Sequence, residues 1–180
     1  MRAVLLPRRL RRTLILVALA ASSAAAGCAP LRPTDGTGGN GRVPIASLER
    51  VRLDCWVDAR IAEPLRRMIA AANADGVALR PEGYFTTDPI PVSACYRSYD
   101  EQAVAREYFC GKGACDKAAA PGTSKHGLGR AVDFRDEKGE LGFDSSGYAW
   151  LVAHAREYGF THPDWAEPNG RNPEPWHWEA

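Results

Sequence analysis

Four cysteines limit the possible folds of this chain more than any other feature. Cys55, Cys95, Cys110 and Cys115 form an even set, which in an oxidising compartment predicts two disulfide bonds. Four cysteines allow three pairings, but the short spacing of Cys110 and Cys115 favours a small loop and leaves Cys55 for Cys95. In the loop-entropy model the small loop contributes about 2 kcal/mol and the large loop about 4 kcal/mol. A zinc site of four thiolates is the alternative, although no spacing is Cys-x-x-Cys.

The N-terminal segment indicates that the chain reaches such a compartment. Residues 1–12 hold five arginines and no acidic residue, and residues 13–21 form a short apolar run. That run is too short for an ordinary transmembrane helix and is typical of an export signal. The sequence Ala-Ala-Gly-Cys ending at Cys28 resembles a bacterial lipobox, in which the cysteine is acylated. We therefore expect a signal peptide over 1–27 and an exported lipoprotein anchored to a membrane at Cys28; ordinary cleavage nearby, leaving a free thiol, is the alternative.

The remaining chain divides into a tether and one domain. Residues 28–47 are rich in glycine, proline and polar residues without periodicity, which predicts a flexible tether. Residues 48–180 have the length of a single domain, which we expect to be monomeric. Loss of the N-terminal arginines would change the net charge from +1 to −4. This mild acidity argues against nucleic acid as a partner and leaves the N-terminal lipid as the expected membrane contact.

The spacing of apolar residues predicts a mixture of helices and short strands. Helices and strands do not alternate regularly, which favours an α+β fold with a small, mainly antiparallel sheet flanked by helices. We expect helices over 58–73, 99–109 and 145–158, an extended segment over 89–96, and strands over 131–134 and 176–178.

Three segments, residues 96–102, 124–133 and 174–177, concentrate the unusual residues of the chain. Catalytic Zn²⁺ prefers three protein ligands, chiefly imidazole and carboxylate, and keeps one position for water. His126 precedes the expected 131–134 strand and Asp133 lies on it, and the glycine-rich turn between them allows both to face one point. His177, on the last expected strand, is the third candidate ligand. This set would leave the bound ion with a net positive charge, which lowers the pKa of a coordinated water.

Two further residues have the chemistry that peptide hydrolysis needs. Glu174 lies three residues before His177, where its carboxylate could accept a proton from the activated water and pass it to a leaving amine. Arg97 offers a fixed positive fork for an oxyanion or a substrate carboxylate. The remaining histidines have structural interpretations: we expect His154 at a hydrogen-bonded core boundary and His162 exposed in a loop.

These segments resemble the zinc D,D-carboxypeptidases of the VanY type. The family pattern is Tyr-Arg-Ser, then Ser-x-His-x-x-Gly-x-Ala-x-Asp, then Glu-x-x-His, and the match runs over 95–178. The resemblance implies a hedgehog/D,D-peptidase-like fold and Zn²⁺ bound by His126, Asp133 and His177. Cys95 and Lys125 depart from the pattern, since many relatives have glycine and an acidic residue or glutamine there.

The resemblance also implies roles for residues around the metal. Glu174 matches the general base and acid, and Arg97 matches the arginine that stabilises the transition state or binds substrate. Ser124 and Gln102 match positions that line the substrate site. The implied function is removal of the terminal D-alanine from peptidoglycan stem peptides.

Several alternatives to this function remain open at the level of sequence. An L,D-carboxypeptidase or a stem-peptide endopeptidase of the same family would use the same residues. Outside the enzymes, the chain could be a zinc-stabilised envelope binding module that has lost catalysis, or a structural lipoprotein stabilised by its disulfides alone.

Overall fold

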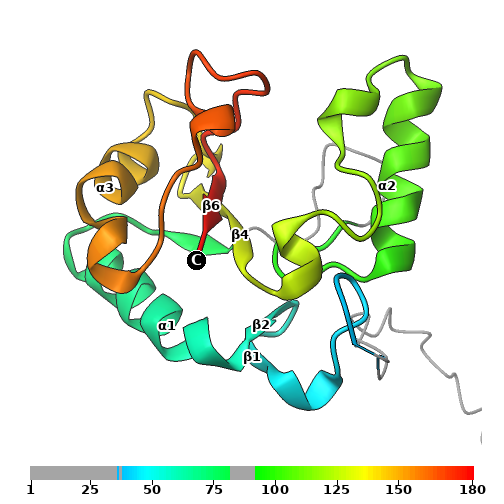
Figure 1. The fold of residues 1–180 in the computed structure, drawn as a ribbon. Helices are drawn as coiled ribbons and strands as arrows, with labels where there is room; N and C mark the ends of the chain where they lie inside the picture. The colour runs from blue at the N-terminus through cyan, green and yellow to red at the C-terminus, as the bar shows by residue number, and fades with distance from the viewer. Residues whose placement is uncertain (1–35, 37, 82–91) are drawn as a thin grey trace, which may run out of the picture.

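The computed structural model describes residue 36 and residues 38–81 and 92–180 (Figure 1). The expected signal peptide, the lipidation site Cys28 and much of the expected tether lie outside the described residues. Among the described helices, none combines the length and apolar character that crossing a membrane requires.

The domain begins with a strand pair that leads directly into a helix. Strands β1 (Leu48–Arg52) and β2 (Cys55–Asp58) are antiparallel, and helix α1 (Ala59–Ala74) follows at once. Asp58 caps the helix, because its carboxylate accepts the Arg60 backbone N–H at 3.0 Å. The helix expected over 58–73 is therefore confirmed to within a residue at each end, whereas the strand pair before it was not predicted.

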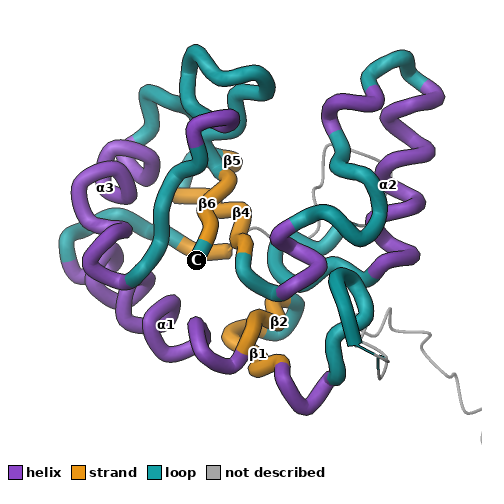
Figure 2. Tube along the Cα trace, viewed as in Figure 1, coloured by secondary structure: helices purple, strands orange, loops and turns teal. Residues whose placement is uncertain are grey.

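A small antiparallel sheet forms the centre of the fold. Strand β4 (Ala131–Asp136) pairs with β6 (His177–Glu179), and farther along with β3 (Arg80–Pro81) and β5 (Gly139–Glu140). The two expected strands are thus confirmed with small shifts in their bounds, as is the α+β class. Helix α1 lies to one side of β4 and β6, and α2 lies to the other (Figures 1 and 2).

The other two expected helices are present with well-defined ends. Helix α2 (Tyr99–Gly111) begins with a capping box formed by Ser98 and Glu101. Helix α3 (Ser146–His154) continues as a 3-10 turn and stops at Gly159, whose φ is +82°. The main core lies between α1, α3 and the sheet; its largest members include Leu65, Met68, Phe134, Leu151 and Phe160.

The four cysteines pair as the spacing favoured. Cys55 bonds to Cys95 and Cys110 bonds to Cys115, with Cα–Cα distances of 5.2 and 4.1 Å. The four-thiolate zinc site is therefore wrong. The first bond fixes strand β2 to the segment before α2, and the second closes the loop after α2.

The expectation for the tether needs correction, and the segment expected to be extended is described only in part. Residues 38–47, assigned to the tether, pack on the domain: the Tyr99 N–H donates to the Gly41 carbonyl at 2.8 Å, and the Gly41 N–H donates to the Gly127 carbonyl. The folded part thus begins before Leu48, because backbone groups of a glycine-rich stretch find partners. Of the segment expected to be extended over 89–96, residues 89–91 lie outside the described residues and 92–96 form no strand, although the Ala94 carbonyl accepts the Asp133 N–H at 2.8 Å.

Candidate active site

A tight turn brings His126 next to strand β4. His126 lies on the 3-10 turn Lys125–Leu128, which Ser124 caps by accepting the His126 N–H at 3.2 Å. Gly129 ends the turn with φ of +67°, and a Cβ there would lie 2.7 Å from the backbone nitrogen of Asp58. Glycine is therefore required at 129, where the chain reverses into β4 and Asp133.

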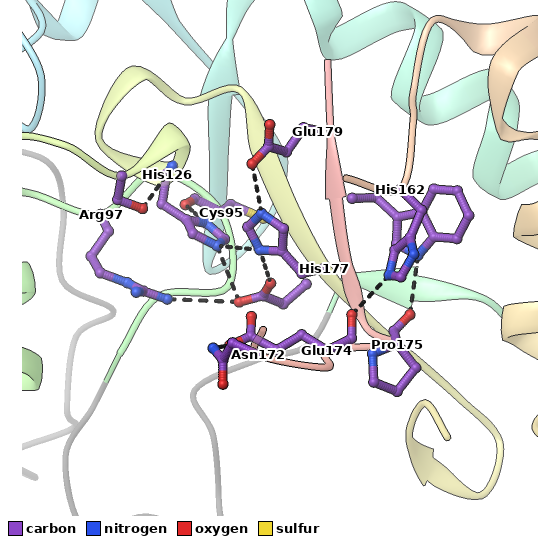
Figure 3. Close-up of polar contacts among 12 residues, drawn as sticks. Cys95, Arg97, His126, His162, Asn172, Glu174, Pro175, His177 and Glu179 are labelled. Atoms are coloured by element: carbon purple, nitrogen blue, oxygen red, sulfur yellow. Dashed lines mark hydrogen bonds and ion pairs between the residues drawn. The ribbon is translucent and has the colours of Figure 1, made fainter. Parts of the chain in front are cut away.

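Three candidate ligands converge between β4 and β6. His126 Nε2 lies 3.3 Å from Asp133 Oδ2, and His177 Nδ1 lies 3.0 Å from Asp133 Oδ1 (Figure 3). The two imidazole nitrogens are 3.2 Å apart. The β4–β6 register pairs Asp133 directly with His177, and all three side chains are buried. One ligand atom from each residue lies within 4.8 Å of the others, so a single ion can meet all three.

The outer nitrogen of each imidazole has its own acceptor. His126 Nδ1 lies 2.8 Å from the Cys95 carbonyl oxygen, and His177 Nε2 lies 3.2 Å from Glu179 Oε1. Because a carbonyl and a carboxylate only accept, these outer nitrogens carry hydrogens, and His126 Nε2 and His177 Nδ1 are the nitrogens that face Asp133 and would bind a metal once His177 gives up its second proton. Metal-binding histidines are usually oriented in this way. Two imidazoles and one carboxylate, so oriented, fit Zn²⁺.

The pKa values of the three candidate ligands shift in different directions. Burial lowers the pKa of His126. Burial also opposes charge on His177, but the hydrogen bonds to Asp133 and Glu179 outweigh it and raise the pKa of His177 to about 9. Likewise, burial raises the pKa of Asp133, but the two imidazoles outweigh it and hold that pKa well below its usual range. A proton on His177 thus occupies the position that a cation would take.

Glu174 is held beside this cluster by the loop that leads to β6. Its backbone N–H donates to the Ala166 carbonyl at 2.9 Å, its carbonyl accepts from His162 Nε2 at 2.9 Å, and its carboxylate accepts from Asn172 Nδ2. Burial, together with the negative charge of Asp133, raises the pKa of Glu174 to about 7. A carboxylate with this pKa exchanges protons readily near neutral pH.

Arg97 lies against Asp133 at the edge of the three candidate ligands. Its Nη2 lies 3.7 Å from Asp133 Oδ2, its Nη1 donates to Gln102 Oε1 at 3.0 Å, and two of its nitrogens donate to the Ser93 carbonyl. Burial lowers the pKa of Arg97, although Asp133 and other acids oppose that effect. An arginine nevertheless remains charged in such a site.

One cleft joins all of these groups. Its volume is about 990 Å³. It is lined by all seven residues that the sequence singled out for chemistry: Arg97, Gln102, Ser124, His126, Asp133, Glu174 and His177. The structure therefore brings together residues that are up to 80 positions apart in the chain.

Sequence reasoning missed or misplaced several neighbours of the site. Glu179 was not singled out, although residues two apart on a strand share a face and His177 could have indicated it. His162 was expected to be exposed, but its side chain is 4% exposed and packs on Trp178. That expectation is wrong because the loop folds back onto the core. For His154 the expectation of a hydrogen-bonded core boundary is confirmed: it is half-buried, its ring lies 4.8 Å from that of Trp150, and its Nδ1 lies 3.2 Å from Glu157 Oε1.

Known proteins of similar sequence fall into one family. Residues 54–179 match the family model described as VanY, D-alanyl-D-alanine carboxypeptidase. A curated D-alanyl-D-alanine carboxypeptidase from Enterococcus faecalis (strain ATCC 700802 / V583) is 33% identical over 130 residues, which is 68% of this chain and 47% of the relative. The chain thus spans about half the length of that relative.

Solved structures of similar fold include complexes with a metal and with a dipeptide. A mutant of the vancomycin resistance D,D-pentapeptidase VanY from a VanB-type cassette, in complex with Zn(II), is 30% identical, with 73% of this chain and 76% of that chain covered and a TM-score of 0.54. VanYB in complex with D-alanine-D-alanine is 29% identical, with 73% and 75% covered and a TM-score of 0.54. The LD-carboxypeptidase LdcB is 28% identical, with 69% and 58% covered and a TM-score of 0.54.

Proposed function

The chain belongs to the VanY family of D-alanyl-D-alanine carboxypeptidases, and from this premise we propose that it is a zinc-dependent enzyme that removes the terminal D-alanine from peptidoglycan stem peptides. The observation that carries the proposal is the convergence of His126, Asp133 and His177 in one cleft with Glu174. The dipeptide bound to VanYB supports the same class of substrate.

His126, Asp133 and His177 would hold the zinc ion. Their donor atoms and the acceptors behind the two imidazoles support this assignment, as does the Zn(II) in the related VanY structure. When bound, zinc would supply a Lewis acid that lowers the pKa of water and polarises a carbonyl.

Glu174 would move the proton during hydrolysis. Its carboxylate takes a proton from the attacking water as the new C–O bond forms at the penultimate carbonyl, and gives it to the D-alanine nitrogen as the C–N bond breaks. A pKa of about 7 suits both directions of transfer near neutral pH.

Arg97 would stabilise the negative charge that develops on the carbonyl oxygen, or bind the substrate carboxylate. Its guanidinium is buried, so this charge acts in a medium of low polarity. Gln102 fixes one arm of the guanidinium, and Ser124 caps the turn that carries His126. Both also line the cleft and would contact substrate there.

We further propose that the enzyme acts as a monomer outside the cytoplasm, attached to a membrane through lipid on Cys28 after removal of residues 1–27. The export signal and lipobox in the sequence support this location, and two disulfide bonds are compatible with an oxidising compartment.

L,D-carboxypeptidase activity is the second candidate. The similarity to LdcB, at 28% identity, favours it because both specificities occur among the structures that share this fold. The enzyme would then remove the single D-alanine of a tetrapeptide stem.

Mass spectrometry of products from defined stem peptides tests the proposal. The zinc-loaded mature chain is incubated with a pentapeptide ending in D-Ala-D-Ala and with a tetrapeptide ending in one D-Ala. We expect the pentapeptide to lose one D-alanine and the tetrapeptide to persist. Conversion of the tetrapeptide to a tripeptide supports the second candidate, and internal cleavage supports an endopeptidase. If protein that contains zinc hydrolyses neither peptide, the result supports the alternative of a zinc-stabilised binding module without catalysis.

A further inference from the structure

The side chain of Asn172 connects Glu174 to the opposite wall of the cleft. Its Nδ2 donates to Glu174 Oε1, and its Oδ1 accepts from Lys117 Nζ at 3.1 Å. Asn172 is 7% exposed and lies beside Glu174 in Figure 3. Neither the ligand pattern nor the acid–base pattern in the sequence assigns it a role.

Lys117 determines which way the Asn172 amide faces. An ammonium group has three donors and no acceptor, so the amide oxygen must point toward Lys117. The amide NH₂ then points toward Glu174 and can only donate to it. A hydrogen bond of this kind favours the ionised carboxylate and limits its rotation.

The backbone on both sides of this contact is held in place. The backbone N–H of Asn172 donates to the Trp165 carbonyl at 3.1 Å. In the same loop, a Cβ at Gly170 would lie 2.3 Å from that carbonyl oxygen, so the backbone packs too closely there for any residue other than glycine. Lys117 ends the 3-10 turn Cys115–Lys117 that follows α2, and Arg106 donates to backbone carbonyls at both ends of this turn. The two walls of the cleft therefore meet at Asn172 from fixed positions.

We propose that Asn172 is a positioning residue for Glu174, with Lys117 selecting the orientation of its amide. The inference rests on the proposed function, because it assigns Asn172 a part in the proton transfer that Glu174 performs. Asn172 aims the carboxylate into the cleft and limits its rotation, so that the same oxygen faces the substrate in both proton transfers.

Asn172→Asp tests this role, since it keeps the shape of the side chain but places a second carboxylate against Glu174. In the zinc-loaded full-length protein we expect kcat to fall by about 10- to 100-fold, KM to change by less than about 3-fold, and the acid limb of the pH profile to move up by about one unit. Zinc content and Tm should remain those of the wild type. Asn169→Asp, an exposed change in the same loop, is the matched control and should leave all of these values unchanged.

Lys117→Met provides a second variant that does not depend on the folding of the loop, because Lys117 is exposed. Loss of its positive charge should move the acid limb in the same direction, with a smaller fall in kcat. If both Asn172→Asp and Lys117→Met keep the wild-type acid limb and kcat, the proposal is wrong. It is also wrong if Asn172→Asp loses activity only in proportion to lost zinc or lost folded protein.

A direct titration separates this inference from the proposed function. The carboxyl carbon of Glu174 is followed by NMR in zinc-loaded, carboxyl-¹³C-glutamate protein, with its signal identified by its absence in Glu174→Gln. The measurement requires no turnover. If the wild type hydrolyses no peptide, the proposed function fails, but a higher pKa of Glu174 in Asn172→Asp would still support the contact. An unchanged pKa would overturn the inference even in an active enzyme.

Discussion

Glu179 should control how tightly the proposed site holds zinc, although it is not one of the ligands. Its Oε1 accepts from His177 Nε2 at 3.2 Å, and His177 is almost fully buried, so little water can replace the lost acceptor in Glu179→Ala. Removal of such an acceptor typically costs 10- to 100-fold in metal affinity, or about 1.4 to 2.7 kcal/mol. Glu179→Gln keeps an acceptor oxygen but not the charge, so its affinity should lie between those of Glu179→Ala and the wild type.

The pH dependence of this loss tests the reasoning further. In the metal-free protein the bond to Glu179 helps to raise the pKa of His177 to about 9, so zinc must displace a proton from His177 below that pH. Glu179→Ala lowers this pKa and weakens the competition. The loss of affinity should therefore be smallest near pH 6.5 and grow toward pH 8.5.

Competition with a chromophoric chelator measures the affinity at each pH. The matched control is Glu157→Ala, whose carboxylate lies at the same 3.2 Å from His154 but on the surface. Unchanged zinc affinity in Glu179→Ala, or an equal loss in Glu157→Ala, would refute the argument.

Three other consequences of the structure can be measured. Glu174→Gln should reduce kcat by about 10²- to 10⁴-fold, while its zinc content, read by metal analysis, stays at the wild-type level. Because the base must be ionised and the pKa of Glu174 is raised to about 7, wild-type kcat/KM should fall as pH drops below neutrality. A kcat/KM profile that is flat down to pH 4 would contradict this role. Asp58→Ala should lower the free energy of unfolding by about 1 kcal/mol in urea titrations at pH 7 through loss of the α1 cap. The hydrogen bonds from Arg60 hold the pKa of Asp58 at about 2, so this difference should be full above about pH 4 and disappear as pH falls through 2; a difference independent of pH would count against it. Replacing Cys55 and Cys95 together by serine should lower the free energy of unfolding by about 4 kcal/mol and weaken zinc binding, since the Cys95 carbonyl orients His126. Loss of the Cys110–Cys115 bond should lower the free energy of unfolding by about 2 kcal/mol and leave the zinc affinity unchanged.

The residues of the proposed site could be predicted because their chemistry is visible in the side chains themselves. Histidine, aspartate and glutamate at the family spacing indicate a metal and a base wherever they lie in the fold. The main helices were predictable for a related reason, since α1 buries residues at helical spacing: Ala62, Leu65, Met68 and Ala72.

The features that escaped prediction depend on contacts that side-chain type does not reveal. Gly41 docks onto the domain through its backbone alone, and a glycine-rich stretch looks like a tether. Asn172 lies in a loop rich in proline and glycine, where an asparagine is usually solvent-exposed, and its partner Lys117 is 55 residues away. Strand β1 buries only Leu48 and β2 buries three of its four residues, so neither strand shows the alternation of buried and exposed residues that would have predicted it.

The geometry of the site follows from the register of one strand pair. His177 and Glu179 share one face of β6, while Trp178 points to the other face, where it is buried and packs on His162. A slip of one residue would bury His177 in the core and move Trp178 into the cleft. Burial of Trp178 therefore holds Asp133 opposite His177, so that packing on the core side of the strand sets the positions of the ligands on the cleft side. Trp178→Ala should accordingly weaken zinc binding as well as stability, even though Trp178 lies on the face of β6 that points away from the ligands.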